Sequence, residues 1–128
     1  MNDHFSFYPY VTKSRWNSYW HQIIEILKLK PKNILEIGCG AKITSQILAS
    51  EGIQVKTLDI DPLNNPDILG SATNMPLENN SFDCVCAFQV LEHMPWENSL
   101  ASIGEMKRVA KKNLVLSLPN QLNAWSYS

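Results

Sequence analysis

Two glycines and a carboxylate lie close together near the start of the sequence. The stretch 33–40 has the apolar run of a short buried strand, and it ends at Gly38 and Gly40 before a helical pattern begins. Glycine at such a turn permits positive φ angles, and backbone N–H groups between a strand and a helix can hold a ligand. Glu36 lies inside the apolar run, and a buried carboxylate is costly unless it is paired or faces a polar cavity. We therefore expect Glu36 to face a ligand cavity.

A second carboxylate, Asp59, ends the predicted strand 54–59, about twenty residues after Gly38. An acid at this place can accept hydrogen bonds from both hydroxyls of a ribose. The alternative is an ordinary aspartate before a turn, since Asp61 and Pro62 follow at once. The upstream glycines favour the ribose role.

The elements that position these residues alternate between strand and helix. This order predicts parallel strands with right-handed crossovers, and hence an α/β, doubly wound, mainly parallel sheet with helices on both faces. A helix is expected at 13–29, where apolar residues recur at three- and four-residue spacing: Trp16, Tyr19 or Trp20, Ile23 or Ile24, and Leu27. The helix that starts at 95–97 is expected to bury Leu100. The expected strands are 33–40, 54–59, 67–70, 82–88 and 113–118, and a further helix is expected at 44–50.

The bulk composition favours one globular domain. We expect residues 1–128 to form it, with an arm and helix at 1–30 and a ligand-binding core at 33–120; the aromatic arm 1–12 is either a surface extension or a substrate lid. A net charge of −1 gives no basic surface for nucleic acid or membrane, and no apolar run has the length of a membrane span. Three cysteines without metal-ligand spacing predict reduced thiols, no metal site and a cytoplasmic location.

Four blocks of the sequence follow one another in an ordered pattern. They are 34–40 (ILEIGCG), 58–62 (LDIDP), 70–77 (GSATNMPL) and 80–93, which holds NSFDCV and VLEH. These blocks resemble the class I S-adenosylmethionine-dependent methyltransferases, and the type 11 subgroup most closely. The resemblance implies a Rossmann-like sheet, S-adenosylmethionine as cofactor and a small-molecule methyl acceptor.

This resemblance implies roles for individual residues. The turn Gly38-Cys39-Gly40 would lie under the methionine part of the cofactor, and Glu36 would hold its amino group. Asp59 would bind the ribose. Ile60, Ser71 and Ala72 would contact the adenine, and Gln89 would lie near the sulfonium. Lys42 occupies the place where many members carry a third glycine, and Ser71 that of a frequent aspartate.

Methyl transfer is an in-line displacement from a sulfonium, so alignment and desolvation supply much of the rate. A base is needed only if the acceptor must lose a proton. His93 is the candidate base, because histidine can take up a proton near neutral pH and His93 follows strand 82–88. Alternatively, His93 packs against or caps the start of a helix. The sequence 87–90 lacks the Asn/Asp-Pro-Pro-aromatic motif of amino-group methylases of DNA and protein, so no nucleic-acid partner is expected.

Two other interpretations compete. A nicotinamide-dependent oxidoreductase would require Gly-x-Gly-x-x-Gly, but Ile43 stands at the third position. The second competing interpretation is a non-catalytic or fragmentary cofactor-binding module. It is considered because the sheet is expected to stop after the fifth strand, 113–118. A bare edge strand is seldom left unprotected. We therefore expect a homo-oligomer formed through the edge of that strand and the C-terminal tail with Trp125.

Overall fold

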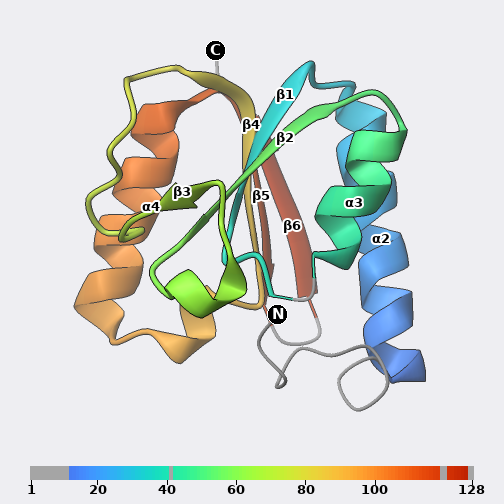
Figure 1. Cartoon of the computed structure of the whole chain (residues 1–128), viewed down its shortest axis with the longest axis horizontal. Helices are drawn as coiled ribbons and strands as arrows, with labels where there is room; N and C mark the ends of the chain where they lie inside the picture. The colour runs from blue at the N-terminus through green and yellow to red at the C-terminus, as the bar shows by residue number, and fades with distance from the viewer. Residues whose placement is uncertain (1–11, 41, 119–120, 127–128) are drawn as a thin grey trace.

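Within the residues that the structure describes, 12–40, 42–118 and 121–126, six strands form one sheet in the order β3-β2-β1-β4-β5-β6. The structure is a computed structural model. Helices cover both faces of the sheet, with α4 on one side and α2 and α3 on the other (Figure 1). The strands are β1 (Asn33–Ile37), β2 (Gln54–Asp59), β3 (Ile68–Leu69), β4 (Phe82–Phe88), β5 (Ala110–Leu118) and β6 (Gln121–Ser126). The helices are α2 (Lys13–Leu29), α3 (Ile43–Ser50) and α4 (Trp96–Val109), with short 3-10 helices η2 (Pro62–Asn64) and η3 (Leu91–His93).

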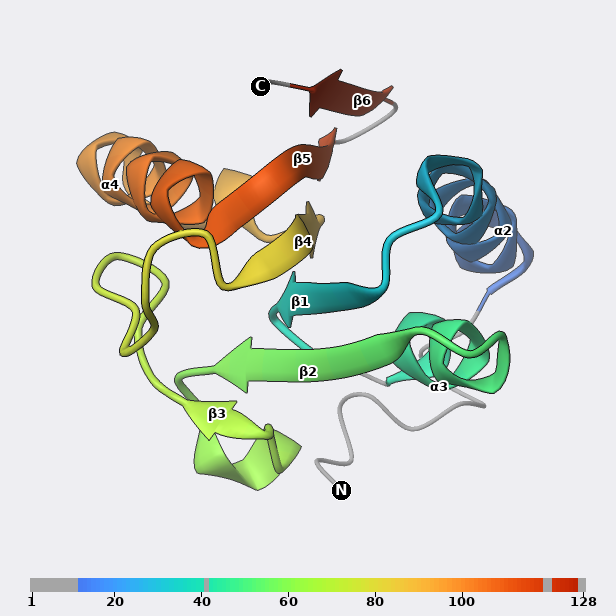
Figure 2. The ribbon, with the colours of Figure 1, turned by 90° about the horizontal axis from the view of Figure 1, so that it is seen from above.

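The strand β1 lies at the centre of the sheet and pairs in parallel with both β2 and β4. The chain leaves β1 towards β2 and β3, then crosses back to β4 and β5 on the other side (Figure 2). Connections that diverge in this way leave a crevice at the carboxyl ends of the two central strands. The predicted doubly wound α/β class is confirmed, and the crevice lies where the glycine turn follows β1.

Alternate residues of β1 pack into two different cores. Leu35 and Ile37 belong to the core under α4, whereas Ile34 packs with Leu48 and the α2 residues Ile23 and Ile26. Because successive side chains of a strand point to opposite faces, Glu36 lies on the same face as Ile34, under α2 and α3. The face that carries the carboxylate is therefore the face where these two helices cover the sheet.

Three large apolar residues of the predicted helical patterns are exposed. Trp16 is 47% and Trp20 56% exposed. The buried residues of α2 are Gln22, Ile23 and Ile26, so Trp16 lies more than one turn before the first of them, and Tyr19 rather than Trp20 packs against the core. In α4, the expectation that Leu100 is buried was wrong: it is 50% exposed, because the buried face runs through its neighbour Ser99 and through Ser102.

The C-terminal segment also differs from the prediction. β6 pairs antiparallel with β5 over six residue pairs, from Asn113 with Ser126 to Leu118 with Gln121. The expectation that the sheet stops at the fifth strand with a bare edge was therefore wrong: β6 covers that edge. Self-association stays an untested prediction, and it no longer has the bare edge as its reason. The aromatic arm 1–11 lies outside the described residues.

Candidate functional site

The turn after β1 requires glycine at its first position. Gly38 has a φ of 75°, and its N–H donates to the Leu58 carbonyl at 2.8 Å, which fixes the turn against β2. A Cβ at Gly38 would lie 2.8 Å from Val90 Cγ2. Both the left-handed backbone and the close approach of Val90 exclude a larger residue without strain. Gly40, with a φ of 47°, repeats this conformation two residues later.

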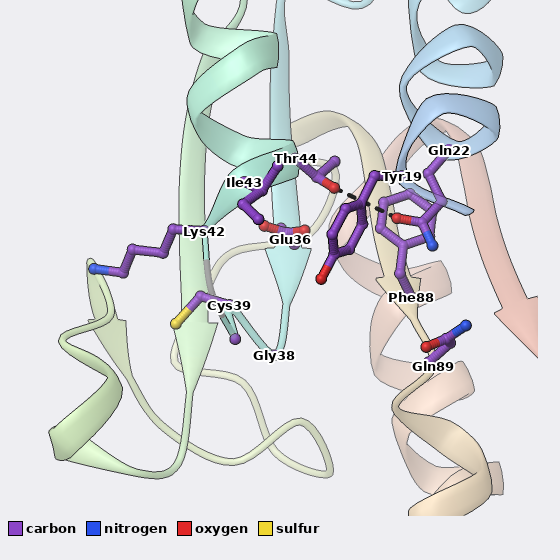
Figure 3. A pocket seen from close by; sticks show the side chains of 11 residues that line it. Tyr19, Gln22, Glu36, Gly38, Cys39, Lys42, Ile43, Thr44, Phe88 and Gln89 are labelled. Carbon is purple, nitrogen blue, oxygen red and sulfur yellow. Dashed lines mark hydrogen bonds between the residues drawn. The ribbon is translucent and has the colours of Figure 1, made fainter. Parts of the chain in front are cut away.

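Glu36 is the buried carboxylate of the site. Its side chain points into a pocket beside this turn, between α2 and α3 (Figure 3). The residue is 6% exposed, and its Oε1 is buried without a hydrogen-bond partner. Burial raises the pKa of this carboxyl from 4.5 to about 8, because the charged form loses its hydration. A cation placed against Oε1 would both satisfy this atom and restore the ionised form.

The pocket around Glu36 is walled by the glycine turn, by α2, by the start of α3 and by the end of β4. The turn contributes Gly38, Cys39 and Gly40, and Gln89 follows β4, so together with Glu36 five of the predicted site residues meet here. Sequence reasoning did not assign the other six lining residues to the site. They are Tyr19 and Gln22 of α2, Lys42, Ile43 and Thr44 at the start of α3, and Phe88 of β4.

Gln22 offers the one sequence signal that could have found the α2 wall. It is a polar residue, 4% exposed, beside Ile23 on the buried stripe of α2. Its Oε1 accepts a hydrogen bond from Thr44 Oγ1 at 3.4 Å, which ties α2 to α3 above the pocket (Figure 3). A buried polar residue on an apolar stripe needs a polar partner or a polar cavity, and here it has both.

Asp59 lies next to the turn at the end of β2. Its Oδ2 accepts from the Cys39 N–H at 3.3 Å and from Asn64 Nδ2 at 3.1 Å, and its Oδ1 accepts from the Asp61 N–H at 2.9 Å. The carboxylate therefore joins the glycine turn to the loop that follows β2. Asp59 is not among the residues that line the Glu36 pocket, and its ribose role stays a prediction.

Lys42 takes over the conformation of the missing third glycine. It has a φ of 64° as the N-terminal flanking residue of α3, a region that side chains other than glycine rarely adopt. Its Nζ donates to the Asn65 carbonyl at 2.6 Å. This hydrogen bond anchors the loop after β2 to the start of α3, which offsets part of the strain at the turn.

The predicted adenine residues lie apart from the Glu36 pocket. Ile60 is 71% exposed at the end of β2. Gly70, whose N–H donates to the Asp59 carbonyl at 3.0 Å, leads into Ser71, and the Ser71 hydroxyl accepts from the Thr73 N–H at 3.2 Å. Ala72 is 8% exposed and packs in the core under α4. Ser71 thus follows Gly70, which is hydrogen-bonded to the Asp59 carbonyl. Neither Ser71 nor Ala72 lines the Glu36 pocket.

Gln89 and His93 follow β4 but have different surroundings. Gln89 has a φ of 56°, and its N–H donates to Ser117 Oγ at 2.9 Å, which turns its side chain into the pocket. His93 ends η3 with a side chain that is 78% exposed, 3.6 Å from the Glu92 carboxylate. His93 is not among the pocket-lining residues, so any role as base requires an acceptor that extends beyond the pocket.

The three thiols are free, and each has a raised pKa. Burial, the Asp59 charge and its hydrogen bond raise the pKa of Cys39 to about 11. Burial raises that of Cys84 to about 12 and that of Cys86 well above its ordinary value. All three thiols are therefore protonated and weakly nucleophilic at neutral pH.

The comparison with protein families decides the assignment of this fold and site. The family described as Methyltransferase domain, type 11, matches residues 35–118, from β1 to the end of β5. The chain belongs to this family. S-adenosylmethionine is the cofactor expected of such a methyltransferase domain, and the unpaired Glu36 Oε1, beside a turn whose first residue is held to glycine, fits its cationic amino-acid end.

Individual relatives agree with this assignment. Norajmaline N-methyltransferase of Rauvolfia serpentina is 32% identical over 99 residues, covering 63% of this chain and 33% of that enzyme. An S-adenosylmethionine-dependent methyltransferase of Methanosarcina mazei has 27% identity and a TM-score of 0.59, covering 66% of this chain and 50% of its own. A Pyrococcus horikoshii protein has 19% identity and a TM-score of 0.67 over 91% of this chain and 65% of its own, which shows the shared fold. The chain thus spans a third of the curated relative's length.

None of the helices in the described ranges combines the length and apolarity needed to cross a membrane.

Proposed function

We propose that this methyltransferase domain binds S-adenosylmethionine at the carboxyl ends of β1, β2 and β4 and takes part in methyl transfer to a small molecule. The observation that carries the proposal is Glu36, whose buried Oε1 lacks a partner in a pocket formed by the glycine turn. A carboxylate in this state favours a cationic ligand, and the amino group of the cofactor is such a cation. Membership in the methyltransferase family does not favour the alternative of a non-catalytic module.

The residues around the pocket support distinct contacts. Gly38 and Cys39 present backbone at close range, and Asp59 is bonded to the Cys39 N–H, which favours a ribose beside the turn. Gln89 enters the pocket from β4 and is the residue that we assign to the sulfonium end. The protein's own contribution would then be to align the methyl group and exclude water. Ile60, Ser71 and Ala72 stay assigned to the adenine by resemblance.

The acceptor class is proposed from the relative's name and from the exposed position of His93. Norajmaline N-methyltransferase is named for transfer to nitrogen, so small amines are the first acceptors to assay. An amine that is already neutral needs no base, whereas a phenol or an ammonium would need His93 or solvent to take its proton. We also propose a cytoplasmic location on the three free thiols, which agree with a reducing compartment.

The proposal is tested by following S-adenosylhomocysteine formation from S-adenosylmethionine with panels of small amines and phenols. We expect turnover with at least one class of acceptor, and its loss when Gln89→Ala alters the sulfonium end. Turnover that Gln89→Ala leaves unchanged would contradict the assignment of Gln89, and no turnover with any panel would contradict the enzymatic part of the proposal.

A further inference from the structure

The side chain of Asn64, in η2, makes one favourable contact and lacks another. Its Nδ2 donates to Asp59 Oδ2 at 3.1 Å, whereas its Oδ1 is buried with no hydrogen-bond partner. The reverse orientation of the amide would place two oxygens at that distance, so the carboxylate fixes which end faces it. A buried unpaired acceptor is unfavourable, and such a group in a folded protein requires an explanation.

The two oxygens of Asp59 are unequally occupied. Oδ2 accepts from the Cys39 N–H at 3.3 Å and from the Asn64 amide, while the Cys39 thiol, 3.6 Å from Oδ2, has a nearer acceptor in the Asn64 carbonyl at 3.5 Å. Oδ1 accepts from the Asp61 N–H alone among the described residues. Each carboxylate oxygen offers about two lone pairs. Oδ1 therefore has room for one further donor, and Oδ2 has none while the Asn64 amide is in place.

A ribose presents two neighbouring hydroxyls, and a carboxylate that binds both needs a vacant acceptor position on each oxygen. We propose that the amide of Asn64 holds the place of one ribose hydroxyl on Asp59 Oδ2 and rotates away when the ribose binds. This inference rests on the proposed function. It adds Asn64 to the site as a residue that sets how strongly the ribose is recognised.

Displacing the amide has a small net cost. Rotation of the Asn64 side chain breaks one hydrogen bond to a charged group, and the release of the buried Oδ1 to solvent offsets only part of that loss. Two hydrogen bonds hold the backbone of the loop independently of the Asn64 amide. The Asn64 carbonyl accepts from the Cys39 thiol at 3.5 Å, and the next carbonyl, that of Asn65, accepts from Lys42 Nζ at 2.6 Å.

Removing the amide should therefore improve binding instead of weakening it. In the wild type, the binding free energy from the hydrogen bond between the second ribose hydroxyl and Asp59 is partly offset by the loss of the hydrogen bond between Asn64 and Asp59. In Asn64→Ala nothing has to be displaced, so affinity for S-adenosylhomocysteine should rise by about 3- to 10-fold. The preference for S-adenosylhomocysteine over its 2′,3′-dideoxyribose analogue, which has no hydroxyl to displace the amide, should rise by a similar factor.

The experiment measures dissociation constants of both compounds by calorimetry for the wild type, Asn64→Ala and Asn64→Leu. Leucine keeps the branched shape of asparagine without its donor, so it serves if the alanine variant does not fold. Leu63→Ala is the matched control, because Leu63 lies in the same short helix and is 69% exposed. We expect tighter ribose-dependent binding in both Asn64 variants and no change in the control.

Weaker or unchanged binding in the Asn64 variants, with a wild type that binds normally, would overturn this inference and leave the proposed function intact. It would mean that the amide stays in place and contributes to the site. No binding of S-adenosylhomocysteine by folded wild type would overturn both.

Discussion

Replacing Glu36 with glutamine removes the charge of the buried carboxylate and keeps its shape. The carboxyl is 6% exposed, its Oε1 is unpaired, and burial raises its pKa to about 8. The account therefore predicts two opposite effects of Glu36→Gln. The ligand-free protein becomes more stable at alkaline pH, while binding of the cofactor becomes weaker.

The size of the stability effect follows from proton linkage. The folded state holds this proton more tightly than the unfolded chain, whose carboxyl has its ordinary pKa of 4.5. Its contribution to stability is therefore fully present below pH 4.5 and is lost as the pH rises through about 8. At about 1.4 kcal/mol per pH unit, the full loss is about 4–5 kcal/mol. Glutamine does not titrate, so above pH 8 the Glu36→Gln variant should be more stable than the wild type by up to this amount.

The size of the binding effect follows from the lost charge. A charge-assisted hydrogen bond contributes about 1.5–3 kcal/mol, so Glu36→Gln should weaken binding of S-adenosylhomocysteine by roughly 10- to 100-fold near pH 8. At pH 7 the free carboxyl is mostly protonated, and a bound ammonium group would favour its ionised form. Binding by the wild type should then release close to one proton, and binding by the variant should release none.

The assay is calorimetric titration in buffers of different ionisation enthalpy, together with thermal unfolding between pH 5 and 9. Glu51→Gln is the control, because Glu51 is an exposed carboxylate at the far end of α3. Refutation would come from a Glu36→Gln protein whose affinity, proton release and pH profile match those of the wild type. Such a result would mean that Glu36 does not face the ligand.

Three further substitutions test other parts of the fold. Gly38→Ala should lower the free energy of unfolding by roughly 1–3 kcal/mol and abolish cofactor binding, because the new Cβ clashes with Val90 and strains the backbone. Gly52→Ala is the control: Gly52 also has a positive φ, but it has open space around it. This variant should show the backbone strain alone and bind the cofactor normally. Gly104→Ala in α4 meets nothing within 4 Å and should raise stability by about 0.5–1 kcal/mol in urea unfolding, so a loss would show a hidden contact. Arg108→Met should speed amide hydrogen exchange in the loop before β4. The reason is that the Arg108 guanidinium donates to the Leu77 carbonyl at 2.7 Å and to the Met75 carbonyl at 3.1 Å. Unchanged exchange would mean that packing, and not Arg108, holds the loop.

The sequence was sufficient for the central part of the fold. The strands 54–59 and 82–88 were predicted with their observed bounds. The segment 82–88 is apolar apart from Asp83, because both faces of a central parallel strand are buried, whereas 54–59 was recognised from its place between Gly52 and the turn at Asp61-Pro62. The position of Glu36 also followed from the sequence, since a carboxylate in a buried strand leaves few alternatives. The turn was predicted from its glycines, although the close approach of Val90 was not.

Other features depend on packing that the sequence does not reveal. β6 is a polar segment on an edge, where strand formation depends on pairing with β5 more than on an apolar pattern. Trp16 and Trp20 matched the helical period but are exposed, because Trp16 lies more than one turn before the first buried residue of α2 and Tyr19 packs in place of Trp20. The wall that Gln22 forms over the pocket, and the contact between Asn64 and Asp59, join residues far apart in the chain or in a loop without regular spacing.

The central claim is that the glycine turn and Asp59 together bind S-adenosylmethionine. It is tested most directly by titrating the purified chain with S-adenosylhomocysteine, as wild type and as Asp59→Ala, with Asp59→Asn to keep an acceptor for the Asp61 N–H. We expect micromolar binding by the wild type that is weaker by roughly 1–3 kcal/mol in both variants. Binding that is unchanged in folded Asp59→Ala, or absent in folded wild type, would contradict the claim.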